Sequence, residues 1–194
     1  MIYLTQYVME EKMMKATGIV RRIDDLGRIV IPKEIRRTLH IRESDPLEIF
    51  TDREGQVILK KYSPIGEMTT FAKQYAESLA QVSGHATLIA DRDQFIAVSG
   101  GCKQLLNKSV SRQLEEKVNN RETVIAAKGD RNYVNIAEDI AVDYAWQLIT
   151  PIICEGDIIG SMILLENDEK SKMGEVEQKL ALSAAGFLGR QMEQ

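Results

Sequence analysis

Hydrophobic and polar residues alternate with a period of two over much of residues 18–61, which is the pattern of half-buried β-strands. In the first such segment Ile19, Arg21 and Ile23 share one face, and the residues between them share the other. The sequence Asp-Asp-Leu-Gly at 24–27 is a turn signal, because Asp side chains bond local backbone and glycine takes a positive φ readily. The pattern predicts two hairpins, with strands at residues 18–23, 28–31, 47–51 and 56–61.

A short helix is predicted between the hairpins, starting at Pro32, because proline at the first helical position costs no hydrogen bond. Ile35 and Leu39 lie four residues apart on its inward face. This block of about 48 residues is too small to bury a self-sufficient core without a disulfide or a metal. Pairing with a second copy is the expected remedy, so the sequence predicts a homodimer through the N-terminal block.

The period of the pattern changes in the second part of the chain. Apolar positions at i, i+3, i+4 and i+7 predict one amphipathic helix over 68–82 and another over 176–191. The segments between them favour a helix at 107–119 and strands at 86–90, 95–98, 123–127, 145–153 and 158–165. Strands gathered in a sheet with flanking helices predict an α+β fold, with a sandwich as the second domain.

Ser-Pro-Ile-Gly at 63–66 separates the two blocks, because Pro and Gly interrupt regular structure. Charge changes at the same point: residues 15–62 hold 11 Lys/Arg and 8 Asp/Glu, whereas residues 63–194 hold 13 and 19. We therefore expect an N-terminal domain at 14–62, a linker at 63–66 and a C-terminal domain at 67–194. Residues 1–13 are an extension to which we assign no role.

Composition limits the class of protein and the cellular compartment that we expect. The chain of 194 residues is 44% hydrophobic and 28% charged, which is ordinary for a globular protein. It contains no apolar run near the ~20 residues that span a bilayer, and residues 1–12 lack the pattern of a signal peptide. The two cysteines lie far apart, without the spacing of metal ligands. We expect a cytoplasmic protein with no membrane partner.

A cationic segment stands out in this acidic chain. Residues 15–42 hold eight Lys/Arg against three Asp/Glu, a net charge of +5, whereas the whole chain is −4. Such a segment favours a polyanion, and nucleic acid is the expected partner. Four arginines, whose planar forks suit phosphates and guanine edges, are the first candidates: Arg21, Arg28, Arg36 and Arg37. Three further cations are expected to contact phosphates without reading sequence: Lys15, Arg22 and Lys33.

The same segment carries a long motif, KATGIVRRIDDLGRIVIPKEIRRTL, followed by DPLEIF and VILKKY. Over residues 14–62 it closely resembles the swapped-hairpin DNA-binding domain of AbrB-type transition-state regulators. The resemblance implies a β-barrel dimer in which hairpins exchange between chains, and its DNA-contacting positions match the same four arginines. His40 and Ser44 depart from the family pattern in the loop after the helix.

With its second block included, the whole chain resembles two-domain regulators of this kind. The resemblance implies a GAF-like C-terminal α/β sandwich and a homotetramer, built as a dimer of dimers through the C-terminal helices. It further implies activation and repression of sporulation genes in the forespore. A GAF-like domain is compatible with a small-molecule effector, which the resemblance does not identify.

Two other functions stay open. Small swapped-hairpin domains also occur in antitoxins, which usually carry a short acidic toxin-binding tail. Some GAF-like domains reduce free methionine sulfoxide through cysteines; Cys102 follows a glycine pair and is expected to be exposed, and Cys154 ends a strand. The usual cysteine cluster is missing, so we expect no enzyme activity, catalytic residue, metal or cofactor. We expect Tyr133, Tyr144 and Trp146 to be core residues, and His85 to complement a helix end.

Overall fold

The structure is a computed structural model, and it describes residues 17–43 and 45–193. The chain divides into two compact units, one ending at Glu43 and one starting at Ser44. The helices and strands confirm the predicted α+β class. Lys15 and Ser44, which the sequence singled out, lie outside the described residues.

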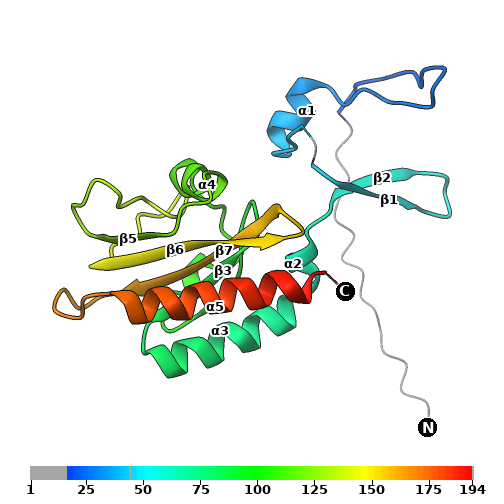
Figure 1. Ribbon diagram of the computed structural model, residues 1–194. Helices are drawn as coiled ribbons and strands as arrows, with labels where there is room; N and C mark the ends of the chain where they lie inside the picture. Colours follow the sequence, from blue (N-terminus) through cyan, green and yellow to red (C-terminus); the bar gives the residue numbers. More distant parts are fainter. Residues whose placement is uncertain (1–16, 44, 194) are drawn as a thin grey trace, which may run out of the picture. The chain divides into compact units, whose positions relative to one another are not determined.

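Residues 17–43, the described part of the first unit, contain a tight turn and one short helix, α1 (Lys33–Thr38), which Pro32 precedes as expected (Figure 1). The turn forms as predicted, since the Asp24 amide donates to the Arg28 carbonyl at 3.0 Å and the Gly27 amide to the Asp24 carbonyl at 3.0 Å. The strands predicted at 18–23 and 28–31 do not form in the single chain, and residues 17–43 contain no strand.

Apolar side chains explain this difference. Val20, Leu26 and Val30 are 89%, 70% and 72% exposed, so the two arms beside the turn lie against no hydrophobic surface. Alternating hydrophobic and polar residues give a strand one apolar face, which must pack against other apolar side chains. An isolated pair of strands whose apolar face stays in water is at best marginally stable. The arms of the single chain are therefore extended but carry no ladder of hydrogen bonds.

The second unit begins with the other predicted hairpin, which is confirmed. Strands β1 (Leu47–Thr51) and β2 (Val57–Lys61) pair antiparallel in a continuous register. Asp52 closes the turn, because its Oδ1 accepts from the amides of Glu54 at 2.9 Å and Gln56 at 2.8 Å. An Asp in this place bonds local backbone as the turn pattern predicts.

The segment predicted as a break forms a short helix, α2 (Pro64–Glu67). Ser63 caps it, since its Oγ accepts from the Gly66 amide at 3.1 Å. Ile65 is 1% exposed and belongs to a core cluster with Ala72 and Ala76. Proline therefore starts a helix here, and the segment contributes to the packing of the second unit.

A five-stranded sheet of antiparallel neighbours, in the order β4-β3-β7-β6-β5, is the centre of the second unit. Its strands are β3 (Ala86–Ala90), β4 (Phe95–Ser99), β5 (Val124–Ala127), β6 (Trp146–Cys154) and β7 (Asp157–Glu166). All five were predicted, with ends that shift by one residue at most. Each strand has a short hydrophobic pattern bounded by turn residues, which is why the sequence located them well.

Helices cover both faces of this sheet (Figure 1). On one face lie α3 (Thr69–Ser83) and α5 (Glu175–Gln191), and on the other lies α4 (Arg112–Asn119). The 3₁₀ turn η1 (Lys103–Leu105) is on the side of α4, since Leu105 and Leu114 belong to the same core cluster. The helix predicted at 107–119 begins five residues late, because the Phe95 amide donates to the Lys108 carbonyl at 3.0 Å and holds that segment beside β4. Within the described residues, no helix is long and apolar enough to cross a membrane.

Candidate nucleic-acid interface

The turn at 24–28 positions the first of the candidate arginines. Asp24 Oδ1 accepts from the Arg28 amide at 2.7 Å and from the Leu26 amide at 3.0 Å. Asp24 Oδ2 also accepts from the Arg28 Nε at 2.8 Å. The Arg28 backbone bond, and then its guanidinium, lower the pKa of Asp24. One carboxylate therefore orders both the turn and the side chain that follows it, and Gly27 permits this with a φ of +76°.

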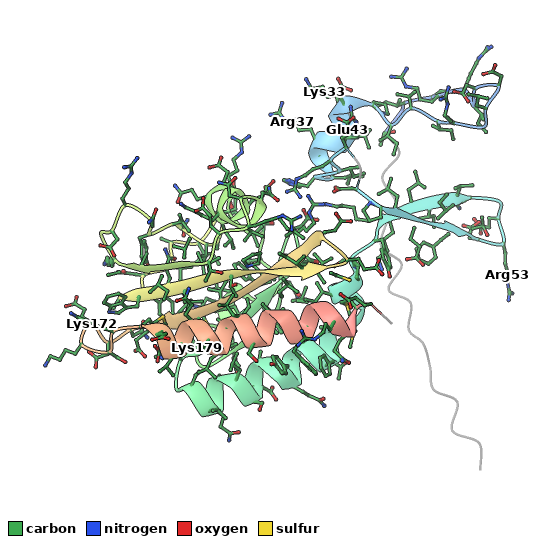
Figure 2. All side chains as sticks on the ribbon, viewed as in Figure 1. Lys33, Arg37, Glu43, Arg53, Lys172 and Lys179 are labelled. Atoms are coloured by element: carbon green, nitrogen blue, oxygen red, sulfur yellow. The ribbon has the colours of Figure 1, made fainter. Side chains whose placement is uncertain are left out.

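The remaining described candidates come from two elements of the same unit. Arg21 and Arg22 are exposed on the extended arm before the turn. Lys33 and Arg37 are exposed on α1, where residues four apart lie on the same helix face, as Figure 2 shows for these two side chains. Arg36 is half-buried in the last turn of α1, where a cation complements the carbonyl end of the helix.

Apolar residues are exposed among these cations. In the first unit Ile23 is 65% and Ile29 54% exposed. The β1–β2 hairpin in turn exposes Ile49 and Val57 at 67% and 65%. Contiguous exposed apolar surface on a small domain marks an interaction face. Each unit therefore exposes apolar side chains of the kind that interaction faces carry.

The aromatic residues considered for a ligand pocket have structural partners. The Tyr133 hydroxyl donates to the Tyr144 carbonyl at 3.0 Å, and the Trp146 indole donates to the Glu169 carbonyl at 3.3 Å. Tyr144 packs against the core cluster on the α4 side of the sheet, whereas Trp146 packs against the cluster under α3 and α5. Burial raises the pKa of the Tyr144 hydroxyl to about 12. The sheet separates Tyr144 from Trp146, so these two rings do not line one pocket.

The cysteines differ from expectation at one position. Cys102 is fully buried, not exposed, because Gly100 and Gly101 adopt φ values of +81° and +117° that turn the chain back over the core. Burial raises the pKa of its thiol, and desolvation followed by neighbouring carboxylates raises that of Cys154. Cys102 belongs to one core cluster and Cys154 packs against the other. Neither thiol is set up as a thiolate, and the pair is not brought together.

His85 has a role that the sequence did not reveal. We expected it to complement the end of a helix, but it is 8% exposed and its Nδ1 lies 2.7 Å from Glu166 Oε2. Its Nε2 lies 3.9 Å from Glu177 Oε1. The imidazole thereby links the end of α3, the end of β7 and the start of α5. The partners are more than 80 residues away along the chain, so no local signal could have found them.

An exposed basic unit followed by an α+β domain defines a two-domain protein, and comparisons with known proteins identify its class. A family model described as "Stage V sporulation protein T C-terminal, transcription factor" matches residues 67–193. A second, "Antidote-toxin recognition MazE, bacterial antitoxin", matches residues 20–67. Stage V sporulation protein T of Bacillus subtilis is 56% identical over 93% of this chain and 100% of that protein. The chain belongs to the stage V sporulation protein T family of transcription factors.

Three further proteins resemble parts of the chain. The transition state regulatory protein AbrB of Bacillus subtilis is 43% identical over 56% of this chain and 93% of that protein. The GAF domain of an Acinetobacter phosphoenolpyruvate-protein phosphotransferase superposes with a TM-score of 0.53, at 14% identity, over 64% of this chain and 81% of that one. The second GAF domain of DevS from Mycobacterium smegmatis does so with a TM-score of 0.51, at 10% identity, over 64% and 91%. The AbrB-type relationship, the GAF-like fold and the transcription-regulator function predicted from the sequence are confirmed.

Proposed function

We propose that this chain is a sequence-specific, double-stranded-DNA-binding regulator that activates and represses sporulation genes in the forespore cytoplasm. The observation that carries the proposal is the cationic segment 15–42, which is largely exposed over its described residues 17–42, within a member of this transcription-factor family. In this proposal Arg21, Arg28, Arg36 and Arg37 make the main DNA contacts. Lys15, Arg22 and Lys33 add phosphate contacts that set the register.

The N-terminal DNA-binding domain, at 14–62, is proposed to act as a homodimer. Its support is the exposed apolar surface of both hairpin segments, which a single chain leaves in water. Exchange of hairpins between two chains would cover that surface and pair the arms at 18–23 and 28–31. A dimer would also repeat the arginines about a two-fold axis, as a pseudo-palindromic site requires.

The domain at 67–194, joined through residues 63–66, is proposed to assemble dimers into a homotetramer and to sense a small-molecule effector. An aromatic cluster bridges its two long helices: Tyr75 and Phe187 have ring centroids 5.4 Å apart, and Phe71 lies 6.0 Å from Phe187. Phe187 and Leu182 on α5 stay 36% and 46% exposed. Aromatic and aliphatic side chains presented on a helix pair suit burial between protomers.

Two alternative functions receive less support. A methionine sulfoxide reductase needs reactive thiols, whereas Cys102 is buried and both thiol pKa values are raised, so we propose that the protein is not an enzyme and needs no cofactor. An antitoxin would agree with the match over residues 20–67. Its acidic toxin-binding tail, however, is replaced here by a domain with a five-stranded sheet.

Mapping of bound DNA across the genome tests the proposal. The full chain and a version ending at residue 66 would be expressed at equal levels and crosslinked to DNA in sporulating cells. We expect the full chain to occupy discrete sites upstream of sporulation genes, and the shortened chain to occupy them more weakly. Uniform, unspecific recovery of DNA with the full chain would contradict the proposal.

A further inference from the structure

Four charged side chains meet where the β1–β2 hairpin joins the sheet domain. Asp45 and Lys61 stand at the base of the hairpin, and Arg92 and Asp93 lie in the turn between β3 and β4. Asp45 Oδ1 accepts from the Arg92 guanidinium at 3.1 Å, and its Oδ2 lies 3.4 Å from the Lys61 ammonium. Lys61 also donates to Asp93. Charges therefore alternate across the junction, and each side contributes both signs.

Burial makes this cluster more than a surface ion pair. The Asp45 side chain is 2% exposed and that of Lys61 22%, whereas the ion pair of Lys128 and Asp143 is 60% and 72% exposed. Ion pairs on the surface contribute little, but a carboxylate taken out of water requires partners, and removing one is strongly destabilising. Two partners of Asp45, Arg92 and Lys61, lie on opposite sides of the junction.

The same turn is also bonded to the segment that follows β2. Ser63 Oγ donates to Asp91 Oδ2 at 3.1 Å, and Asp91 Oδ1 accepts from the amides of Asp93 at 2.8 Å and Gln94 at 2.7 Å. Burial raises the pKa of Asp91, and these bonds oppose that rise. Asp91 thus shapes the turn and attaches it to the residue that caps α2.

Next to the turn, strands β3 and β7 are packed so closely that there is no room for a side chain at Gly160. Ala90 pairs with Ser161 of β7, and a Cβ placed on the neighbouring Gly160 would lie 2.2 Å from the Ala90 carbonyl oxygen. Close packing of this kind transmits a displacement because it cannot absorb it. A shift of the sheet at β3 and β7 would therefore move the turn at 91–94.

We propose that the turn at 91–94 is the docking site for the base of the β1–β2 hairpin, and that it couples the state of the GAF-like sheet to the DNA-binding domain. The proposal rests on the proposed DNA-binding function, and adds the route by which an effector would act on it. Residues 61–66 are then a rigid connection, not a hinge. A displacement of the turn would change the orientation of the hairpin, and with it the affinity of the proposed dimer for DNA.

The test replaces Arg92→Gln together with Asp93→Asn in the full chain. Hydrogen exchange is followed at the Tyr62 amide, which donates to the Pro46 carbonyl at 3.0 Å, and at the Gly66 amide. We expect hydrogen exchange at both amides to accelerate about tenfold, because the ion pairs that restrain local opening of the hairpin base are removed. Affinity for an operator fragment should fall about threefold to tenfold as the hairpin loses its preorganisation.

The matched control is Lys128→Gln with Asp143→Asn, an exposed ion pair of the same domain that should change neither measurement. Arg92→Lys keeps the charge and should stay close to the wild type in both measurements. Near-UV circular dichroism verifies that each variant is folded. Unchanged exchange in the double variant would overturn the docking site, and faster exchange with unchanged affinity would overturn the coupling. If the wild-type chain itself bound no DNA, the proposed function would fail, while hydrogen exchange would still decide whether the turn holds the hairpin.

Discussion

Asp24 and Arg28 are bound to each other twice, once through the Arg28 amide at 2.7 Å and once through its Nε at 2.8 Å. The carboxylate therefore fixes the backbone of the turn and the direction in which the guanidinium leaves it. Because this ion pair is made through Nε, the two terminal nitrogens of Arg28 are not part of it. An acidic residue inside a basic segment thus supports the proposed DNA site by orienting one of its arginines.

This relationship predicts that Asp24→Ala weakens DNA binding although it removes a negative charge. Asp25→Ala is the matched control, since it removes the same charge from the neighbouring position. We expect Asp24→Ala to bind an operator fragment about threefold to tenfold more weakly than Asp25→Ala, because preorganisation of the turn is lost. Fluorescence anisotropy at one salt concentration measures both. Equal affinities would show that the turn does not position Arg28 for DNA.

The start of α5 predicts an acid-sensitive step in stability. The Glu177 carboxylate accepts from the Gly174 amide at 2.7 Å, and this bond is the main cause that lowers its pKa below the ordinary 4.5. A lowered folded-state pKa contributes stability above the unfolded value, and the contribution is lost as the pH falls through the folded value. Thermal unfolding between pH 7 and pH 3 should therefore show a smaller acid loss for Glu177→Gln than for the wild type. Glu175→Gln, at a side chain 78% exposed, should keep the wild-type profile; identical profiles for all three would refute the assignment.

Two glycines of α5 predict opposite effects of the same substitution. A Cβ on Gly189 would lie 2.1 Å from the Ile153 carbonyl oxygen, whereas one on Gly186 would meet its nearest atom at 3.9 Å. Gly189→Ala should cost about 1–3 kcal/mol in the free energy of unfolding, because backbone atoms must shift. Gly186→Ala should gain up to ~1 kcal/mol, because alanine is the better helix former. Urea denaturation measures both, and a neutral Gly189→Ala would contradict the close packing of α5 on β6.

The aromatic cluster predicts the assembly state. Phe187→Ser removes the α5 side of the cluster with Phe71 and Tyr75 and should convert the proposed tetramer into dimers. Leu106→Ser, at a side chain 44% exposed beside η1, is the control and should leave the assembly unchanged. Sedimentation velocity distinguishes the two states. Tetramers that persist in Phe187→Ser at low protein concentration would exclude this face as the interface.

Local patterns predicted the parts of the fold that depend on local information. The five strands of the sheet carry short hydrophobic runs between turn residues, and α3 and α5 carry helical periodicity. The arms at 18–23 and 28–31 carry an equally clear pattern, yet they form no strand within the described chain, because no hydrophobic surface of the single chain covers their apolar side chains. The cationic segment could also be located from the sequence alone, because the net charge of a segment, like its hydrophobic pattern, depends only on the residues within it.

Contacts distant in sequence account for what the patterns missed. His85 was expected to complement a helix end, but a carboxylate 81 residues away defines its environment. Cys102 was expected to be exposed after its glycine pair, but those glycines return the chain to the core. Nothing in the residues around Asp45 or around Arg92 indicates that these two side chains form an ion pair. Each of these depends on which segments the sheet brings together, which no single segment specifies.

The central claim is that arginines of the N-terminal unit bind DNA, and the double variant Arg36→Ala with Arg37→Ala tests it most directly. Its control is Lys172→Ala with Lys179→Ala, which removes two exposed cations from the GAF-like domain and changes the net charge equally (Figure 2). Operator affinity is measured by fluorescence anisotropy over a salt series. The account predicts at least about a tenfold loss for the arginine variant alone, and a log–log salt slope reduced by ~0.9 for each phosphate contact removed. Equal affinities and equal slopes for the two double variants would contradict it.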